Sequence, residues 1–586
     1  MPTLDWIGKK AVVKHHKDVP YRLLEPVAEL SHGDPDSGNL IVQGDNLHAL
    51  KALLPRYAGK VKCIYIDPPY NTGSEGWVYN DNVSSPEISK WLDEVVGKEG
   101  EDLSRHDKWL CMMYPRLTLL KNFLKEDGVI MISMDDFEIH TLRLLMNEIF
   151  GANNFIAQIV WDKTRKNDAR LFSTGHEYLL IYAKSLSHLR KVKTIWREQK
   201  PGAKEIIQEW KKFRDEHDDD YESIQENLRA WYKNLPKGDP SKKLSRYKWV
   251  DKNGPWRDRD ISWPGGGGPR YDVIHPVTKK PCKVPERGWG FANQEVMGEQ
   301  IRLGLIVFRD DHTEPPFRKA HLLPIPEEVD DVGSETDISD TNEEQVGLQV
   351  MPSVIQKQSQ VAVRTLRDIF SGEKVFENPK DHEILARFIE YVTDDGDFIL
   401  DSFAGSGSTG HAVLDINKRT NTKRNFILVE LNEKIAETIT SERIRRVCEG
   451  YTTAKGKDIE GLGSGFQFSR LSDEPLFNSE GQIHGEVTFF RLAEFVWFTE
   501  TGSGFTGSAD SPLLGVYEGR AIYLLYNGIL KDRSVNGGNV LTTPVLDVLP
   551  GFDGSKVIYA AACRLGNGRL NKLGIQFKQT PYALEI

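Results

Sequence analysis

The chain has 586 residues, too many for one hydrophobic core, so we expect about two to four domains. Its 39% hydrophobic and 28% charged residues are ordinary for a globular protein and exclude a largely disordered chain. The formal net charge is −10, so any contact with nucleic acid must depend on a local concentration of basic residues.

No run of about 18 apolar residues is present, and the first residues lack the apolar core of a signal peptide. The sequence therefore predicts a cytoplasmic protein with no membrane contact. The spacing of the cysteines argues against a zinc site or a disulfide framework, so no metal is expected. They are scattered without a Cys-x-x-Cys pair: Cys63, Cys111, Cys282, Cys448 and Cys563.

Residues 1–38 are rich in Lys, His and Pro and are expected to form a loosely structured lead-in. Residues 39–185 then alternate between apolar strands and amphipathic helices, which predicts a doubly wound α/β fold with a parallel sheet covered on both faces. Asp45 can cap the helix that follows the first strand. His176, at the edge of a later strand, is expected to be a structural histidine.

The stretch Val61–Gly73 is the most informative part of the sequence. A buried strand ends in Asp67-Pro68-Pro69-Tyr70, and two prolines cannot continue a ladder of hydrogen bonds. The resulting turn presents a carboxylate, a proline carbonyl and an aromatic ring at the carboxyl end of a strand, where open α/β sheets bind ligands. An exocyclic amine on a planar base needs these groups, two acceptors and a ring to stack on. An ordinary strand-ending turn is the alternative. The polar, aromatic loop 71–82 that follows is long enough to close over a base.

Regular alternation stops in residues 186–370, which are polar, aromatic and punctuated by Gly and Pro. Basic residues are concentrated at 241–260 among Tyr and Trp, a combination suited to contacts with phosphates and bases. The alternative is a solvated basic face. An acidic segment, 327–344, is expected to be an exposed linker. The candidate DNA-binding residues are Lys242, Lys243, Arg246, Lys248, Arg257 and Arg259.

The α/β pattern returns in residues 371–465. A strand ends in Asp401, and Gly405 and Gly407 allow a tight turn before a helix N-terminus. We expect a side chain at either glycine to meet a ligand. This segment also satisfies G-x-G-x-x-G, so a dinucleotide dehydrogenase is an alternative, but that match alone is weak and Asp-x-Phe-x-Gly-x-Gly is more selective.

Residues 466–586 contain short runs with a strand-like composition (487–490, 521–526 and 556–562) separated by glycine turns. They predict a C-terminal α+β segment without chemistry of its own. Packing against the rest of the chain, contacts with a second copy and contacts with a partner are all open as roles of this segment.

These motifs resemble those of DNA amino-methyltransferases, whose signature is Asp/Asn/Ser-Pro-Pro-Tyr/Phe. The catalytic turn precedes the cofactor loop, which is the order of the β class. Several segments further resemble modification subunits of type III restriction-modification systems: Gly-Asp-Asn-Leu at 44–47, Asp-Pro-Pro-Tyr-Asn-Thr-Gly at 67–73, HEYLLIYAK at 176–184, Phe-x-Asn-Pro-Lys at 376–380 and IQFKQTPYALEI at 575–586. One departure is Asp381, where the family often has proline.

The resemblance implies a Rossmann-like sheet built from a catalytic half (39–185) and a cofactor half (371–465), with a target-recognition region (186–370) between them. It implies transfer of a methyl group from S-adenosylmethionine to adenine N6 of a flipped base in double-stranded DNA. A homodimer and a restriction subunit with helicase and nuclease activities are the implied partners. The implied catalytic residues are Asp67, Pro68, Pro69 and Tyr70, and the implied cofactor residues are Asp45, Asn378, Lys380, Asp401, Phe403, Gly405, Gly407 and Glu430.

Two other functions are compatible with the motifs. A cytosine-N4 methyltransferase is one, although the family more often has Ser in place of Asp67 for that substrate. A recognition-only DNA-binding subunit is the other, and the intact motif residues disfavour it. No Walker-type G-x-x-x-x-G-K-[ST] loop is present, so DNA cleavage would need a separate subunit.

Overall fold

The computed structural model divides into two compact units, one of Met1–Thr194 with Pro352–Ile586 and the other of Ile195–Met351. The loop at 73–82 and the acidic segment 327–344 lie outside the residues that the structure describes. Those residues are 4–34, 37–72, 104–163, 171–323, 347–478, 480–485, 487–508, 510–532, 538–581 and 584.

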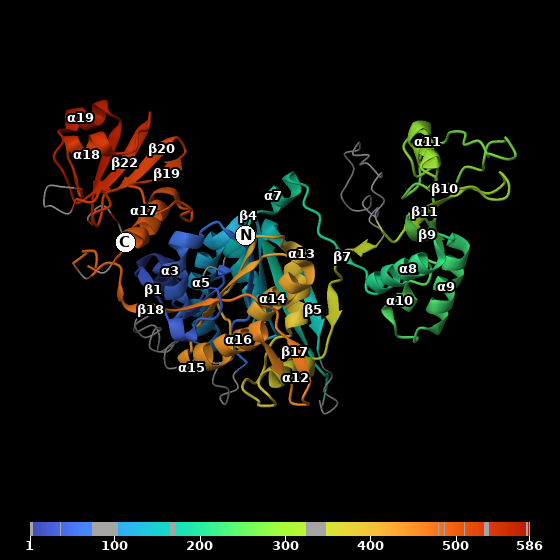
Figure 1. The fold of residues 1–586 in the computed structure, drawn as a ribbon, viewed down its shortest axis with the longest axis horizontal. Helices are drawn as coiled ribbons and strands as arrows, with labels where there is room; N and C mark the ends of the chain where they lie inside the picture. Colours follow the sequence, from blue (N-terminus) through green and yellow to red (C-terminus); the bar gives the residue numbers. More distant parts are fainter. Residues whose placement is uncertain are drawn as a thin grey trace. The chain divides into compact units, whose positions relative to one another are not determined.

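A ten-stranded sheet forms the centre of the first unit, in the order β1-β18-β2-β15-β14-β3-β4-β6-β5-β13. Neighbouring strands from β18 through β4 are parallel. Figure 1 shows that strands from opposite ends of the chain, β1 and β18, lie side by side in it. The strands are β1 (Arg22–Pro26), β2 (Leu40–Gln43), β3 (Val61–Ile66), β4 (Leu124–Met134), β5 (Phe155–Asp162), β6 (His176–Ala183), β13 (Val354–Gln356), β14 (Phe398–Asp401), β15 (Asn425–Glu430) and β18 (Gln467–Pro475).

The edges of this sheet differ from the fully parallel arrangement that the sequence predicted. β6 is antiparallel to both β4 and β5, and β1 is antiparallel to β18. β1 lies in the lead-in 1–38, and β18 lies beyond residue 465, so the sheet extends past both expected limits. The short segment RLLEP carries two charged residues and a proline, which edge strands tolerate but which give no strand signal in the sequence.

Helices cover both faces of the sheet. One continuous core joins Ile427 and Val429 of β15 with α3 and α5, whereas Leu428 points to the other face, where a Cβ at Gly410 of α14 would lie 3.0 Å from it. The doubly wound arrangement expected from the sequence is therefore present. The main helices are α3 (Asn46–Tyr57), α5 (Arg105–Phe123), α6 (Ile139–Met146), α13 (His382–Val392), α14 (Ser408–Thr420) and α16 (Ser441–Glu449).

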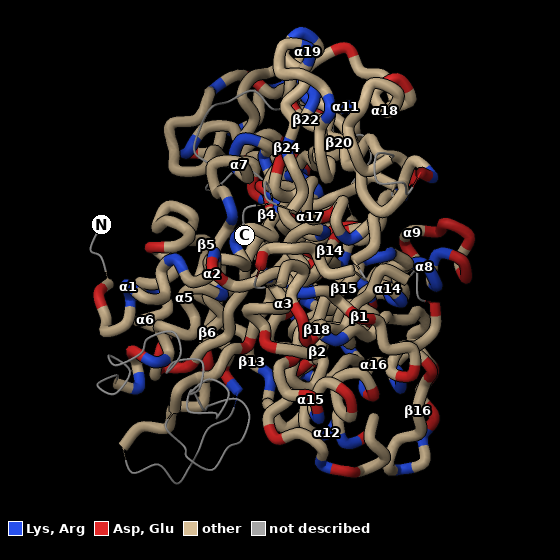
Figure 2. The backbone as a smooth tube through the Cα atoms, turned by 90° about the vertical axis from the view of Figure 1, so that its left-hand side faces the viewer, with Lys and Arg blue, Asp and Glu red and all other residues tan. Residues whose placement is uncertain are grey.

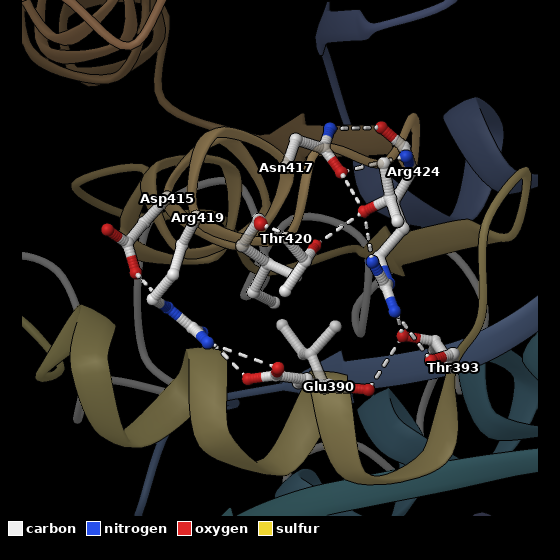
Figure 3. Close-up of polar contacts among 10 residues, drawn as sticks. Glu390, Thr393, Asp415, Asn417, Arg419, Thr420 and Arg424 are labelled. Carbon is white, nitrogen blue, oxygen red and sulfur yellow. Dashed lines mark hydrogen bonds and ion pairs between the residues drawn. The ribbon is translucent and has the colours of Figure 1, made fainter. Parts of the chain in front are cut away.

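A polar network joins α13 to α14 and to the start of β15 (Figure 3). Arg419 of α14 makes two hydrogen bonds to Glu390 of α13, at 3.1 and 2.7 Å. Arg424 donates to the hydroxyl and to the carbonyl of Thr393, at 2.9 and 2.8 Å, just beyond the end of α13. These contacts fix the helix that begins at the glycine loop against the helix that follows Lys380.

The C-terminal segment has a separate four-stranded sheet, β19-β20-β22-β24, with α17 on one face and α18 and α19 on the other. The α+β composition expected for this segment is therefore present. The run 487–490, expected to resemble a strand, is instead the start of α17, because Thr488 caps the helix and its aromatic residues are buried. The elements are α17 (Phe489–Thr501), β19 (Leu513–Tyr517), β20 (Arg520–Leu524), α18 (Thr543–Val548), β22 (Ser555–Ala560), α19 (Asn567–Lys572) and β24 (Ile575–Gln579).

Short elements complete the first unit: α1 (Lys9–Val12), α2 (His15–Asp18), α7 (Leu186–Lys191), α12 (Gln360–Ile369), α15 (Glu433–Ile435), β16 (Gly450–Thr452), β17 (Asp458–Glu460), β21 (Val540–Leu541) and β23 (Ala562–Cys563). Within the described parts of the chain, no helix is long and apolar enough to cross a membrane.

The second unit lies within the range 186–370 predicted for target recognition and is more regular than expected. Two amphipathic helices, α8 and α9, pack against an antiparallel sheet of order β10-β11-β9-β8. Basic and acidic residues are interspersed along both units (Figure 2). The elements are β7 (Glu198–Gln199), α8 (Ala203–His217), α9 (Tyr221–Asn234), α10 (Pro240–Lys243), β8 (Trp249–Asp251), β9 (Gly254–Arg259), α11 (Gln294–Arg302), β10 (Ile306–Val307), β11 (Phe317–His321) and β12 (Leu348–Gln349).

Candidate active site

The Pro-Pro turn and the glycine loop meet at one edge of the central sheet. β3 and β14 are adjacent and parallel, so Asp67 and Asp401 lie at the carboxyl ends of neighbouring strands, as the sequence predicted. Both carboxylates line one cavity. The other residues that line it are Tyr65, Phe376, Asn378, Pro379, Lys380, Phe403, Ala404, Gly405, Ser406, Ser408 and Thr409.

Side chains of α5 and of the segment before α6 hold the second half of the turn. Trp109 of α5 donates its indole N–H to the carbonyl of Pro69 at 2.7 Å, and Asn71 donates to the buried carboxylate of Glu138 at 2.5 Å. The carbonyl of Pro68 accepts no hydrogen bond from the described part of the chain. A contact of this carbonyl with a ligand stays a prediction.

A buried charge network surrounds Asp67 and Tyr70. The ammonium of Lys380 lies 3.0 Å from Asp67 Oδ1, as an ion pair and not as an aligned hydrogen bond. The same ammonium donates to the Tyr70 hydroxyl at 2.6 Å and to Glu177 Oε2 at 3.0 Å. Lys163 pairs with the same oxygen of Glu177 at 2.5 Å.

Burial and these ion pairs perturb the pKa values of the network. Burial would raise the pKa of Glu177, yet the ammonium groups of Lys163 and Lys380 hold it at about 2. Burial lowers the pKa of Lys163 to about 8. Burial also raises the pKa of Asp67, against the opposing effect of Lys380, and raises the pKa of Tyr70 well above its ordinary value. Glu177 is therefore a fixed anion, whereas the ionisation of Asp67 depends on Lys380.

Sequence reasoning assigned Lys380 to the cofactor and missed Glu177 and Lys163. The side chain of Lys380 lines the cavity but ends at the Pro-Pro turn. A signal for Glu177 was present in the sequence, since a carboxylate inside the apolar strand HEYLLIYA must be paired when it is buried. His176 bonds the hydroxyl of Tyr178 at 2.9 Å, a structural contact as expected.

Asp401 shapes the glycine loop from within. Its carboxylate accepts from the backbone N–H of Phe403 at 2.9 Å and from the Thr409 hydroxyl at 2.6 Å. Burial raises the pKa of Asp401 to about 7. A cationic ligand in the cavity would therefore favour the ionised form of this group.

Glu430 also binds the loop. Its two carboxylate oxygens accept the backbone N–H groups of Gly405 and Asn432, each at 2.8 Å, and burial raises its pKa to about 8. The resemblance implied that Glu430 contacts the cofactor. In this structure both carboxylate oxygens already bind backbone groups, and a cofactor contact stays a prediction.

Side chains at Gly405 and Gly407 would meet the protein itself, and their contact with a ligand stays a prediction. Both residues have positive φ angles, 50° and 76°. A Cβ at Gly405 would lie 3.3 Å from the ring of Phe376, and one at Gly407 would lie 3.3 Å from Thr440. The glycines are needed because the loop turns tightly against the protein itself.

Asp45 is the N-cap of α3, as one of the two readings of the sequence proposed. It accepts from the N–H groups of Leu47 and His48, at 2.9 and 3.2 Å, and pairs with Arg116 at 3.0 Å. Despite burial, Arg116 and His48 keep the pKa of Asp45 below its ordinary value. A contact of Asp45 with the cofactor stays a prediction, as does that of Asn378.

The basic residues predicted to bind DNA lie in the second unit. Lys248 stacks on Trp249 with its ammonium 5.3 Å from the ring centroid, and Arg257 lies 5.8 Å from the ring of Tyr247. Lys242 differs, because its ammonium donates to the carbonyls of Lys233 and Leu235 at the end of α9. Lys243 follows Lys242 at the end of α10, Arg246 lies 5.6 Å from the Tyr247 ring, and Arg259 ends β9. Sequence reasoning missed Arg229, 4.5 Å from the ring of Trp249, and Lys319, 5.2 Å from that of Trp256.

A doubly wound sheet that brings an Asp-Pro-Pro-Tyr turn and an Asp-x-Phe-x-Gly-x-Gly loop to one cavity defines a Rossmann-like methyltransferase. A family model described as DNA methylase matches residues 61–441. The EcoP15I Mod subunit, of a type III restriction-modification enzyme from Escherichia coli, is 31% identical over 563 residues, covering 93% of this chain and 79% of that protein.

The EcoPI Mod subunit of Escherichia phage P1 is 27% identical with the same two coverages. The type II methyltransferase M.KpnI of Klebsiella pneumoniae is 27% identical, covering 75% of this chain and 94% of that protein. The chain therefore belongs to the DNA methylase family and is a DNA methyltransferase related to type III Mod subunits. S-adenosylmethionine is its methyl donor.

Proposed function

We propose that the protein methylates adenine at N6 in double-stranded DNA, after the target base has been flipped into the cavity between the Pro-Pro turn and the glycine loop. The observation that carries the proposal is the pair of acceptors, one on Asp67 and one on Pro68, beside an aromatic ring at the end of β3. The carbonyl of Pro68 has no donor in the described chain, and Asp67 Oδ1 is the carboxylate oxygen turned toward Lys380. Asp67 Oδ2 and the Pro68 carbonyl can then accept the two hydrogens of an amino group.

The chemistry follows from these contacts. The lone pair of an adenine amine is delocalised into its ring, so the amine is a poor nucleophile. Acceptors on both amine hydrogens draw the nitrogen toward sp³ geometry, while Tyr70 stacks on the base and holds it in plane. S-adenosylmethionine supplies an electrophilic methyl group bonded to a sulfonium. The N–C bond forms as the S–C bond breaks, and the nitrogen releases one proton to Asp67 or to water. Flipping costs a few kcal/mol, which contacts in the cavity must offset.

The cavity suits the cofactor chemically. Asp67 and Asp401 line the cavity, and a sulfonium cation beside them would favour their ionised forms. Helix α14 begins at Ser408, and the backbone N–H groups of its first turn favour a carboxylate. Phe403 and Phe376 offer apolar rings. We assign the predicted residues Asn378, Asp401, Phe403, Gly405 and Gly407 to cofactor binding on that basis.

DNA recognition is proposed for the second unit. Its basic residues lie among aromatic rings, with Arg229 and Lys248 both over Trp249, which suits contact with phosphates and sugars. Likeness to type III Mod subunits also supports assembly with a restriction subunit and as a homodimer. Co-purification with a restriction subunit encoded beside this chain, and the mass of the free protein in solution, would test those two assemblies.

The test of the main proposal is the product of the reaction. The purified chain is incubated with radiolabelled S-adenosylmethionine and duplex DNA, and the nucleosides are then separated. We expect label in N6-methyladenine only. Label in N4-methylcytosine would replace adenine by cytosine as the target. Cofactor and DNA binding without transfer would favour a recognition-only subunit.

A further inference from the structure

We propose that Lys380, Glu177 and Lys163 form a charge network of positioning residues that fixes the catalytic turn. In this network Lys380 keeps Asp67 ionised and directs the second carboxylate oxygen of Asp67 toward the target amine. This inference rests on the proposed function and adds residues to it. Of the three, only Lys380 was expected from the sequence, and as a cofactor contact.

The ammonium of Lys380 contacts both Asp67 and Tyr70. It lies 3.0 Å from Asp67 Oδ1, 2.6 Å from the Tyr70 hydroxyl and 4.8 Å from the centroid of the Tyr70 ring. One charged group therefore contacts both residues that must hold the base. With Oδ1 turned toward Lys380, the second oxygen of Asp67 is the one left for the amine.

The carboxylate of Glu177 holds the Lys380 ammonium in this position. Its ammonium donates to Glu177 Oε2 at 3.0 Å, and the same oxygen accepts from the Tyr70 hydroxyl at 3.1 Å and pairs with Lys163 at 2.5 Å. The Glu177 side chain is only 6% exposed. A buried carboxylate destabilises the folded protein unless it is paired, so Glu177 requires both lysines. Moving Lys380 away from Glu177 would therefore raise the free energy of the folded protein.

A hydrogen bond joins this charge network to the glycine loop. The hydroxyl of Ser408, the first residue of α14, donates to the backbone carbonyl of Lys380 at 2.9 Å. The main chain of Lys380 is thus fixed by the loop, while its side chain is fixed by the turn. A change in the loop on cofactor binding would therefore shift Lys380 and, through it, alter the position and charge environment of Asp67.

The charges around Asp67 set the expected pH dependence. The groups that face it are Lys380, Glu177, Lys163, Asp401, Tyr65 and Tyr70. The two lysines favour the carboxylate, whereas Glu177 and Asp401 disfavour it. Removing Lys380 takes away the nearest cation, so Asp67 should then ionise only at higher pH.

The test compares Lys380→Met, Lys380→Arg and Glu177→Gln with wild type in kcat–pH profiles and in calorimetric titration with S-adenosylmethionine. Lys357→Met is the matched control, because Lys357 pairs with two carboxylates near the same segment, Asp381 and Glu383, without touching the turn. We expect Lys380→Met to lose about 10²-fold in kcat and to move the acid limb up by about one to three pH units.

Lys380→Arg should restore the acid limb, because it restores the cation, and Glu177→Gln should lose activity without moving the limb upward. Cofactor affinity at pH 8 should stay within about threefold of wild type in all variants, and the control should match wild type. A tenfold loss of cofactor affinity in Lys380→Met with an unmoved acid limb would overturn the inference and make Lys380 a cofactor contact. If wild type transfers no methyl group to DNA, the proposed function fails, and this inference with it.

Discussion

The indole N–H of Trp109 donates to the carbonyl of Pro69 at 2.7 Å, and this bond reaches from α5 to the Asp-Pro-Pro-Tyr turn across 40 residues of sequence. The Trp109 side chain is fully buried. It satisfies the carbonyl of Pro69, whereas that of Pro68 accepts no hydrogen bond from the described part of the chain.

Replacing Trp109 by Phe should therefore loosen the turn and leave the Pro69 carbonyl without its donor. An unsatisfied buried acceptor costs about 1–3 kcal/mol, so the free energy of unfolding should fall by that amount. Methyl transfer should fall with cofactor affinity unchanged. Urea titration and radiolabelled transfer on one preparation test this. Wild-type values for both would mean that the bond has no role in shaping the turn.

Gly407→Ala should destabilise the fold rather than block the cofactor directly. Its φ angle of 76° strains any side chain, and its Cβ would lie 3.3 Å from both Thr440 Cγ2 and the Thr440 carbonyl. Gly396→Ala is a matched control with a φ angle of 77° and nothing within 4 Å. The control should lose about 1–2 kcal/mol from backbone strain, and Gly407→Ala should lose more. Equal losses in thermal unfolding would show that the contact with Thr440 relaxes freely.

Part of this site could be predicted from the sequence, and the reason is local. The strand before Asp67 and the strand before Asp401 each have an apolar run, and each ends in residues that cannot continue it. Parallel neighbouring strands then bring both ends to one edge. The orientation of Gly407 could not be predicted, because it depends on Thr440 of another helix.

The charge network of Lys380, Glu177 and Lys163 could not be predicted either, because Lys380 lies far from the other two residues in the sequence. Lys380 and Glu177 are 203 residues apart, and nothing in either motif specifies the other. The edges of the sheet were missed because β1 and β18 are short or charged and pair across 450 residues of sequence. In the second unit, α8 and α9 have clear apolar faces, and the dense Gly, Pro and aromatic punctuation that follows them masked this signal.

The contributions of Asp401 and Glu430 to folding stability should fall as pH rises from about 4 to about 8. Burial raises the pKa of Asp401 to about 7 and that of Glu430 to about 8, above the ordinary carboxyl values of the unfolded chain. Across this range these two carboxyl groups bind more protons in the folded protein than in the unfolded chain, so raising the pH weakens their contribution. Asp401→Asn should remove the part of the pH dependence that Asp401 contributes. Urea unfolding of wild type and Asp401→Asn at pH 5, 6.5 and 8 measures it, and an identical pH dependence in the two proteins would contradict the shift at Asp401.

Neutralising Lys243, Arg246 and Lys248 should weaken binding to all duplexes alike and flatten the dependence of affinity on salt. For every phosphate that is no longer neutralised, the slope of log affinity against log salt should become shallower by about 0.9. Lys242→Gln is the control, because its ammonium binds the end of α9 and should affect stability instead of the slope. An unchanged slope in the triple variant would make this stretch a solvated surface.

Substitutions of Asp67 and Tyr70 distinguish an enzyme from a binding module, because the two residues contribute differently to turnover and to binding. Asp67→Ala removes an acceptor for the amine but leaves the stacking ring, the Pro68 carbonyl and the glycine loop. An interaction made mainly in the transition state affects turnover and not binding. We expect near-normal affinity for cofactor and DNA, with methyl transfer lower by at least about 10²-fold.

Tyr70→Ala should behave differently, because the ring contacts the base before any chemistry occurs. It should weaken capture of the flipped base by about 1–3 kcal/mol of stacking and also slow transfer. Its loss also removes the hydroxyl that bonds Lys380 and Glu177, so Tyr70→Phe, which keeps the ring, isolates the stacking contribution. Filter binding and radiolabelled transfer on the same preparations measure both effects. If Asp67→Ala transfers methyl groups at the wild-type rate, the turn after β3 is not the active site, and the reaction must take place elsewhere in the chain.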